Sequence, residues 1–255
     1  MRHVSLSILA TALFLLLQDT AAAYNRDHGP FPDNASIKPI TMAKLAPSPR
    51  EEDTIGKVDG SRLFTVPEHN NITLRMAECD PGWSAEISVD GKVVREKTKV
   101  TGYYIALQVF TANLNQDKIP DFVVYTFSNG CGLAAGNSHV AFLLSSENTY
   151  HATTIVSLFT DKDDFLLLNG KPCFIQADLL GVEECNDGKR HNFWVYNLVC
   201  IEKDQMKIQN NTAQGFPRII LYTKKPNHSE TTVLSDDQKN ELIESSKKGI
   251  FLESP

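Results

Sequence analysis

The sequence lacks the cysteine patterns of a structural metal site. It has five cysteines, but no CxxC pair and no Cys/His set with the spacing of zinc ligands. Because five is an odd number, at least one cysteine stays unpaired within the chain. We expect Cys173 to pair with Cys185 or Cys200, since the segment between them has the pattern of strand, turn and strand and can fold back on itself.

Basic residues are also few. The chain has 25 Lys and Arg against 31 Asp and Glu, a formal net charge of -6, and no stripe of basic residues interleaved with aromatics. A mildly acidic protein gains nothing from the release of counterions from a phosphate backbone. The composition therefore argues against nucleic acid as a partner.

Long hydrophobic runs are absent except at the N-terminus. Residues 1–23 combine a weakly basic start, the apolar run LSILATALFLLL and small residues before Tyr24. This pattern predicts a secretory signal peptide cleaved after Ala23, because the run is too short to span a bilayer comfortably. An uncleaved N-terminal anchor is the alternative. We expect a secreted or periplasmic protein with no membrane span after signal cleavage.

The rest of the chain divides into three parts. Residues 24–59 carry five prolines, many charges and no sustained period, which predicts a flexible Pro-rich linker. Residues 60–232 hold many short runs rich in β-branched and aromatic residues, with an Asp90-Gly91 hairpin turn and no sustained helical spacing. We expect an all-β domain, built as propeller-like blades or as a sandwich of short antiparallel strands.

Residues 233–255 have a different pattern. Ser235 with Gln238 three residues later is a capping box, acidic residues follow Ser235, and Gly249 follows two lysines. One amphipathic C-terminal helix is predicted, with Leu242 and Ile243 packed on the sheet.

Oxygen-bearing side chains recur in the stretch ANLNQDKIPDFVVYTF, residues 112–127, directly before an apolar strand. A calcium ion takes six to eight oxygen ligands, and a loop supplies them when ligands alternate with outward residues. With Asn113 as position one, the side chains fall at positions one, three, five and nine, and a backbone carbonyl falls at seven. The expected Ca²⁺ ligands are Asn113, Asn115, Asp117, the Ile119 carbonyl and Asp121. The alternative is a polar turn without metal.

This stretch resembles the FG-GAP and VCBS-type repeat, whose loop D-x-[DN]-x-D-G-x-x-D leads into an apolar strand. The resemblance implies calcium binding within a β blade. Two positions depart from the pattern, because Asn113 replaces an Asp and Lys118 replaces the Gly at position six. A left-handed Lys costs on the order of 1 kcal/mol. With two carboxylates, we expect a weak dissociation constant of roughly 10⁻⁴ to 10⁻³ M.

A degenerate second copy is present in LLLNGKPCFIQ, residues 166–176. It aligns with the first copy if two residues are deleted, and it lacks the acidic ligands. The offset from Pro120 to Pro172 is about the size of one propeller-type repeat.

A second cluster supports an alternative chemistry. The stretch GVEECNDGKRHNFW, residues 181–194, gathers carboxylates and a histidine, which a secreted hydrolase could use with a thiol nucleophile. Such an enzyme needs these groups in one concave pocket, with His191 and Glu184 beside His139 or the thiol. The carboxylates and the histidine are Glu183, Glu184, Asp187 and His191. The thiol is Cys131, in the separate stretch SNGCGLAAGNSH, residues 128–139, whose small residues are otherwise typical of a structural turn.

The same stretch is also typical of a solvated hairpin turn at Asn186-Asp187-Gly188-Lys189. We therefore favour an exported binding or structural module over an enzyme. In this interpretation, calcium rigidifies a loop that presents a surface to an unidentified protein or glycan partner.

Overall fold

The structure is a computed structural model that describes residues 37–48, 61–80, 82–101, 106–128, 136–223 and 232–252. The predicted signal peptide and Cys131 lie outside these residues. The described part consists of three antiparallel sheets and one α-helix, α2 (Asp236–Lys248). The prediction of an all-β domain followed by a C-terminal helix is confirmed.

The first sheet has four strands in the order β3-β4-β5-β6. The Asp90-Gly91 turn joins β5 to β6 with φ values of 52° and 73°, as the Asp-Gly pair predicted. The strands are β3 (Arg62–Val66), β4 (His69–Glu78), β5 (Trp83–Val89) and β6 (Lys92–Thr101).

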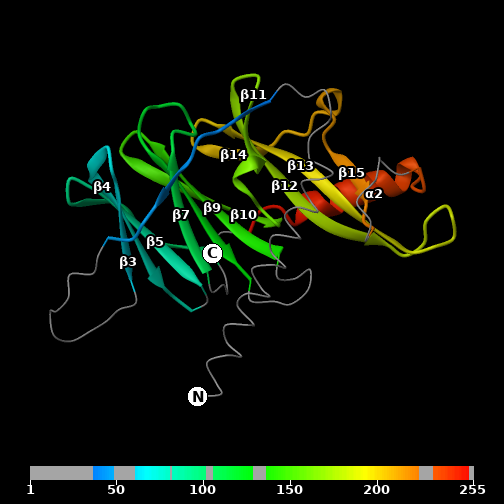
Figure 1. The fold of residues 1–255 in the computed structure, drawn as a ribbon, viewed down its shortest axis with the longest axis horizontal. Helices are drawn as coiled ribbons and strands as arrows, with labels where there is room; N and C mark the ends of the chain where they lie inside the picture. Colours follow the sequence, from blue (N-terminus) through cyan, green and yellow to red (C-terminus); the bar gives the residue numbers. More distant parts are fainter. Residues whose placement is uncertain are drawn as a thin grey trace, which may run out of the picture.

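The second sheet has five strands in the order β10-β9-β8-β7-β2, and it lies between the other two sheets (Figure 1). The strand β8 is buried on both faces, because Phe122 and Val124 pack toward the first sheet while Val123 and Tyr125 pack toward the third. The strands are β2 (Ala43–Leu45), β7 (Ala106–Ala112), β8 (Asp121–Phe127), β9 (Asn137–Ser146) and β10 (Thr149–Leu158).

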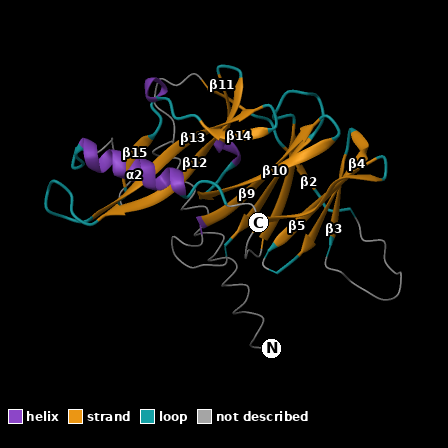
Figure 2. Ribbon diagram, turned by 180° about the vertical axis from the view of Figure 1, so that it is seen from behind, coloured by secondary structure: helices purple, strands orange, loops and turns teal. Residues whose placement is uncertain are grey.

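The third sheet has six strands in the order β1-β11-β12-β13-β14, with β15 also paired to β13. Figure 2 shows this sheet and the helix α2 at one end of the molecule and the four-stranded sheet at the other. The elements are β1 (Ile37–Pro39), β11 (Phe165–Leu168), β12 (Lys171–Val182), β13 (His191–Glu202), β14 (Gln205–Ile208) and β15 (Arg218–Leu221), with short 3₁₀ helices η2 (Lys162–Asp164) and η3 (Thr212–Gln214).

Each sheet contains one four-stranded meander, and the three follow one another along the chain as β3 to β6, β7 to β10 and β11 to β14. They form open sheets, and the described residues close neither a barrel nor a propeller. The edges of the first two sheets are joined by side chains, because Thr149 Oγ1 donates to the Val94 carbonyl at 2.8 Å and Thr154 Oγ1 to the Val100 carbonyl at 2.5 Å.

Two short strands lie in the segment for which the composition predicted a flexible linker. The strand β1 pairs with β11, and β2 pairs with β7, so residues 37–45 connect the third and second sheets. Leu45 is buried in the core. Sheet edges supply these backbone hydrogen bonds, and pairing of this kind needs few apolar side chains, which is why the composition gave no sign of it.

The helix and the disulfide agree with two further predictions. Ser235 Oγ accepts the Gln238 N–H and Gln238 Oε1 accepts the Ser235 N–H, which completes the capping box. Leu242 is buried against the third sheet and Ile243 is half-buried. Cys173 pairs with Cys200, one of its two expected partners, and Cys185 is a buried free thiol. No helix in the described part is long and apolar enough to cross a membrane.

Candidate functional site

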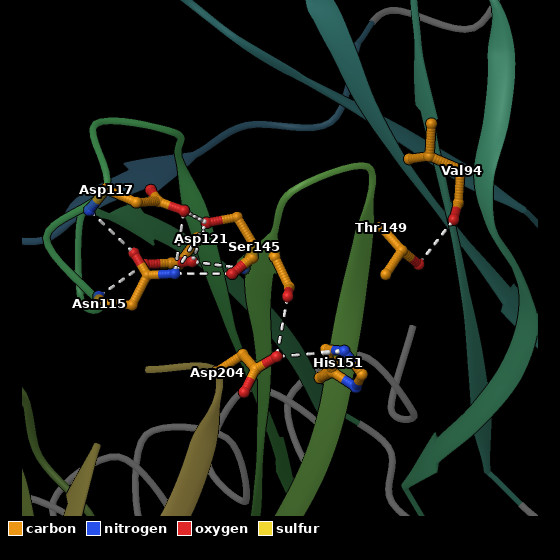
Figure 3. A network of polar contacts seen from close by, with 9 residues as sticks. Val94, Asn115, Asp117, Asp121, Ser145, Thr149, His151 and Asp204 are labelled. Carbon is orange, nitrogen blue, oxygen red and sulfur yellow. Dashed lines mark hydrogen bonds and ion pairs between the residues drawn. The ribbon is translucent and has the colours of Figure 1, made fainter. Parts of the chain in front are cut away.

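The stretch that resembles a calcium loop joins β7 to β8, and Asp121 is the first residue of β8. The Asp121 side chain is fully buried. Its Oδ2 accepts the backbone N–H groups of Leu114 at 2.6 Å and Asn115 at 3.1 Å. Its Oδ1 accepts the backbone N–H of Ser145 at 2.7 Å and the Ser145 hydroxyl at 2.9 Å (Figure 3). Asp121 therefore ties the loop to the end of β9.

Two other predicted ligands meet at the same serine. Asn115 Nδ2 donates to the Ser145 carbonyl at 2.6 Å and to Asp117 Oδ2 at 3.1 Å. Asp117 Oδ2 also lies 2.8 Å from Ser145 Oγ, and Asp117 Oδ1 accepts the Ile119 N–H at 2.7 Å. Ile119 thus contributes its N–H to this network, while Asn113 is exposed on the loop and outside it.

The loop has the backbone conformation expected at position six. Lys118 has a φ of 73°, in the left-handed region that the family's Gly adopts most easily. Gln116 also has a positive φ, 66°. The loop therefore contains two left-handed residues, although each carries a side chain that disfavours this conformation.

Two carboxylates in this network share one proton donor. The Ser145 hydroxyl carries a single hydrogen, yet Asp117 Oδ2 and Asp121 Oδ1 lie 2.8 and 2.9 Å from its oxygen. Burial raises the pKa of Asp121 to about 6, and the hydrogen bonds from Ser145, Asn115 and Leu114 act in the opposite direction. Within the described residues, no basic side chain forms an ion pair with Asp117 or Asp121. A proton or a bound cation would relieve this excess of negative charge.

The predicted ligands meet only some of the requirements of a weak site for a hard cation such as Ca²⁺. The donor atoms are all oxygens, as Ca²⁺ requires, and Asp117 is exposed. Asp121 fits less well as a direct ligand, because its two oxygens already accept four hydrogen bonds. Within the described part of the chain, no three His, Cys, Asp or Glu side chains are grouped as a metal site would need. A cation on this loop would therefore use Asp117 and amide or carbonyl oxygens.

The stretches 113–121 and 166–176 occupy equivalent places in the fold. The first joins the first two strands of the β7 to β10 meander, and the second joins the first two strands of the β11 to β14 meander. Asn169 and Gly170 form the second turn, with φ values of 53° and 78°. The turns also touch, because Gln116 Nε2 donates to the Gly170 carbonyl at 2.8 Å.

Two pockets border the first loop. A shallow one of about 310 Å³ lies between the two turns and includes residues 114–116 and 169–172. A second one of about 350 Å³ lies on the other side, between residues 118–120, the β9–β10 turn and the four-stranded sheet. The loop therefore forms a wall of both.

Among the described residues, those predicted for a hydrolase lie on a surface hairpin, away from the two pockets beside the loop. Asp187 Oδ2 and His191 Nε2 are 2.9 Å apart within the β12–β13 hairpin, and this contact lowers the pKa of Asp187. Glu183 and Glu184 are exposed on the same hairpin. None of these four residues lines either of the two pockets, and His139 lies on β9 of a different sheet. The structure therefore gives no observation in favour of the hydrolase, and Cys131 lies outside the described residues.

A second polar cluster, which the sequence did not indicate, lies beside the loop. Asp204 Oδ2 accepts the Ser146 hydroxyl at 2.8 Å and lies 3.2 Å from His151 Nε2 (Figure 3). The carboxylate is placed between the serine and the histidine, so the histidine has no contact through which to deprotonate the hydroxyl. This arrangement joins β9, β10 and the β13–β14 turn and is not that of a serine nucleophile.

Comparison with known proteins adds no relative, because no family model, no curated protein and no solved structure shows significant similarity to this chain.

Proposed function

We propose that this chain is an exported, β-rich binding module in which the 113–121 loop binds calcium weakly. The observation that carries the proposal is that Asn115, Asp117 and Asp121 converge on Ser145, where the two carboxylates share one hydroxyl hydrogen. The FG-GAP-like spacing and the left-handed Lys118 support the same interpretation.

Calcium would act here on charge and on loop order. A cation at Asp117 offsets the negative charge of the exposed carboxylate and of the buried Asp121 behind it. It also adds a restraint to a loop whose two carboxylates converge on one serine. Because this loop forms a wall of both pockets, the cation would rigidify the surface that meets a protein or glycan partner.

Export is part of the same proposal. The N-terminal pattern of residues 1–23 supports it, and the disulfide between Cys173 and Cys200 is compatible with an oxidising, extracytoplasmic location. The partner is expected to meet the protein outside the cytoplasm.

A calcium titration of residues 24–255, followed by thermal melting, tests this function. If the dissociation constant is roughly 10⁻⁴ to 10⁻³ M, about 10 mM calcium should stabilise the folded state by about 1.4–2.7 kcal/mol. The variant Asp117→Asn should lose this gain, whereas the matched control Glu183→Gln, an exposed carboxylate on another sheet, should keep it. A melting temperature that does not respond to calcium would leave the loop as a polar turn and refute the proposal.

A further inference from the structure

The larger of the two pockets, about 350 Å³, has walls from four segments that are far apart in the sequence. It lies where the four-stranded sheet meets the end of the β9–β10 hairpin, next to the 113–121 loop. A pocket of this size is at the lower end of the range for small-molecule sites, which is roughly 300–1,000 Å³. It is lined by His69, Asn71, Ile72, Val89, Val94, Lys118, Ile119, Pro120, Ser145, Glu147, Asn148, Thr149 and Tyr150.

The inner walls are apolar, and their polar atoms already have partners. Ile72 and Pro120 are buried, and Val89, Val94 and Ile119 are half-buried. The Tyr150 hydroxyl donates to the Pro120 carbonyl at 3.0 Å, and the Thr149 hydroxyl donates to the Val94 carbonyl at 2.8 Å. A polar group placed deep in this pocket would lose its water without gaining a hydrogen bond, so the interior favours an apolar body.

The rim, in contrast, is polar and has free side chains. Lys118 and Glu147 are exposed, carry opposite charges and come from two different turns. Neither side chain has a hydrogen bond or ion pair with another described residue, and the same holds for the rim side chains of His69, Asn71 and Asn148.

Both rim charges stand on left-handed backbone. Lys118 has a φ of 73° and Glu147 a φ of 43°. Both residues lie in turns between strands, where such backbone is common, so turn geometry places their side chains at the pocket mouth.

We propose that this pocket binds a small zwitterion with an apolar side chain, the chemistry of a free aliphatic or aromatic amino acid. The apolar side chain enters between Ile72, Val94 and Pro120. The ligand's carboxylate meets Lys118, and its ammonium group meets Glu147. This inference rests on the proposed binding module and goes beyond it, because it adds a small-molecule ligand to the protein or glycan partner.

Calorimetric titration of residues 24–255 at saturating calcium tests the ligand class. L-phenylalanine and L-leucine should bind. L-serine lacks the apolar body and benzyl alcohol lacks the two charges, so both should bind at least roughly tenfold more weakly. Equal binding of benzyl alcohol, or no binding of phenylalanine and leucine, would overturn the inference.

Matched variants locate the site. Val94→Phe fills the pocket and should abolish phenylalanine binding, whereas Val93→Phe changes the neighbouring residue, which is 52% exposed and outside the pocket lining, and should preserve it. Lys118→Gln and Glu147→Gln should each weaken binding by roughly tenfold, while Lys189→Gln on the distant β12–β13 hairpin should not. Binding that Val94→Phe leaves unchanged would contradict the site.

The two proposals fail separately. If calcium still raises the melting temperature but no amino acid binds, the ligand class is wrong and the calcium-dependent module stands. If phenylalanine binds through Val94 and Lys118 but calcium has no effect, the pocket is correct and the metal is wrong.

Discussion

Asp121 and Ser145 are joined twice through one carboxylate oxygen, because Asp121 Oδ1 accepts both the backbone N–H of Ser145 at 2.7 Å and its hydroxyl at 2.9 Å. The two residues lie on neighbouring strands, β8 and β9, at the end of the sheet where the 113–121 loop begins. This pair fixes the position of the loop whether or not a cation is bound.

Asp121→Asn should therefore destabilise the protein strongly. An amide keeps one oxygen and places an NH₂ group against backbone N–H donors, so buried donors at Leu114, Asn115 or Ser145 lose their acceptor. We expect the free energy of unfolding, measured by urea denaturation at pH 4, where the wild type does not bear the cost of a buried charge, to fall by about 3 kcal/mol. Asp117→Asn, at the exposed position in the same network, should cost less than about 1 kcal/mol. Equal losses in the two variants would contradict an anchoring role for Asp121.

The buried carboxyl also predicts a pH dependence. Burial raises the pKa of Asp121 to about 6, above the value of 3.8 for an exposed Asp, so the folded state binds a proton more tightly than the unfolded state. The contribution of Asp121 to stability is therefore present at low pH and is lost as pH rises from about 4 to about 6. We expect a loss of about 3 kcal/mol across this window.

His139 requires a control, because its effect has the opposite sign. Its burial lowers its pKa to about 4, so its neutral form is favoured on folding, and stability is lost as pH falls from about 6.5 to about 4. The unfolding curves of the wild type and of Asp121→Asn should therefore be compared at each pH, and the difference between them assigned to Asp121. A difference that does not change between pH 4 and pH 7 would show that Asp121 does not titrate in this range.

Local spacing along the chain predicted that the side chains of Asn115, Asp117 and Asp121 lie close together, but it did not predict the main hydrogen-bond partner of Asp121. Asn115, Asp117 and Asp121 share one short loop, and alternation along it shows which side chains can converge. Ser145 is distant in sequence and reaches the loop because β8 pairs with β9 in a register that puts Leu143 opposite Phe122, which brings Ser145 within hydrogen-bond distance of Asp121. Without knowledge of the strand pairing, the sequence alone does not indicate that Ser145 is the partner of Asp121.

The same limit applies to the sheets. Short β-rich runs predicted the strand content and the Asp90-Gly91 hairpin, because both depend on local residue types. The strands β1 and β2 form only by pairing with β11 and β7, which lie much later in the chain. The Pro-rich, charged composition of residues 24–59 gave no indication of this pairing. The choice between Cys185 and Cys200 as the partner of Cys173 was likewise left open until the β12–β13 register placed Cys200 opposite it.

Lys118→Gly should stabilise the loop. Lys118 holds a φ of 73°, where a side chain costs on the order of 1 kcal/mol and glycine does not. Part of this gain is offset by the greater freedom of glycine in the unfolded chain, so we expect an increase of about 0.5 kcal/mol in the free energy of unfolding. Lys189→Gly, at a position without a positive φ, should be neutral or destabilising. If Lys118→Gly lowers the melting temperature, the lysine side chain stabilises the folded state by more than its left-handed backbone destabilises it.

The disulfide between Cys173 and Cys200 should make a large contribution to stability. It closes a loop with a sequence separation of 27 residues, and it links the two central strands of the third sheet, on which the helix α2 packs. Loop-closure entropy predicts that the double variant Cys173→Ser, Cys200→Ser loses about 3–4 kcal/mol in the free energy of unfolding. Cys185→Ser changes a buried free thiol and is the matched control, with an expected loss of about 1–2 kcal/mol. Urea denaturation of the three proteins gives these values directly. A double variant no less stable than Cys185→Ser would mean that β12 and β13 are held by their backbone pairing and packing alone, and that the bond is dispensable for the fold.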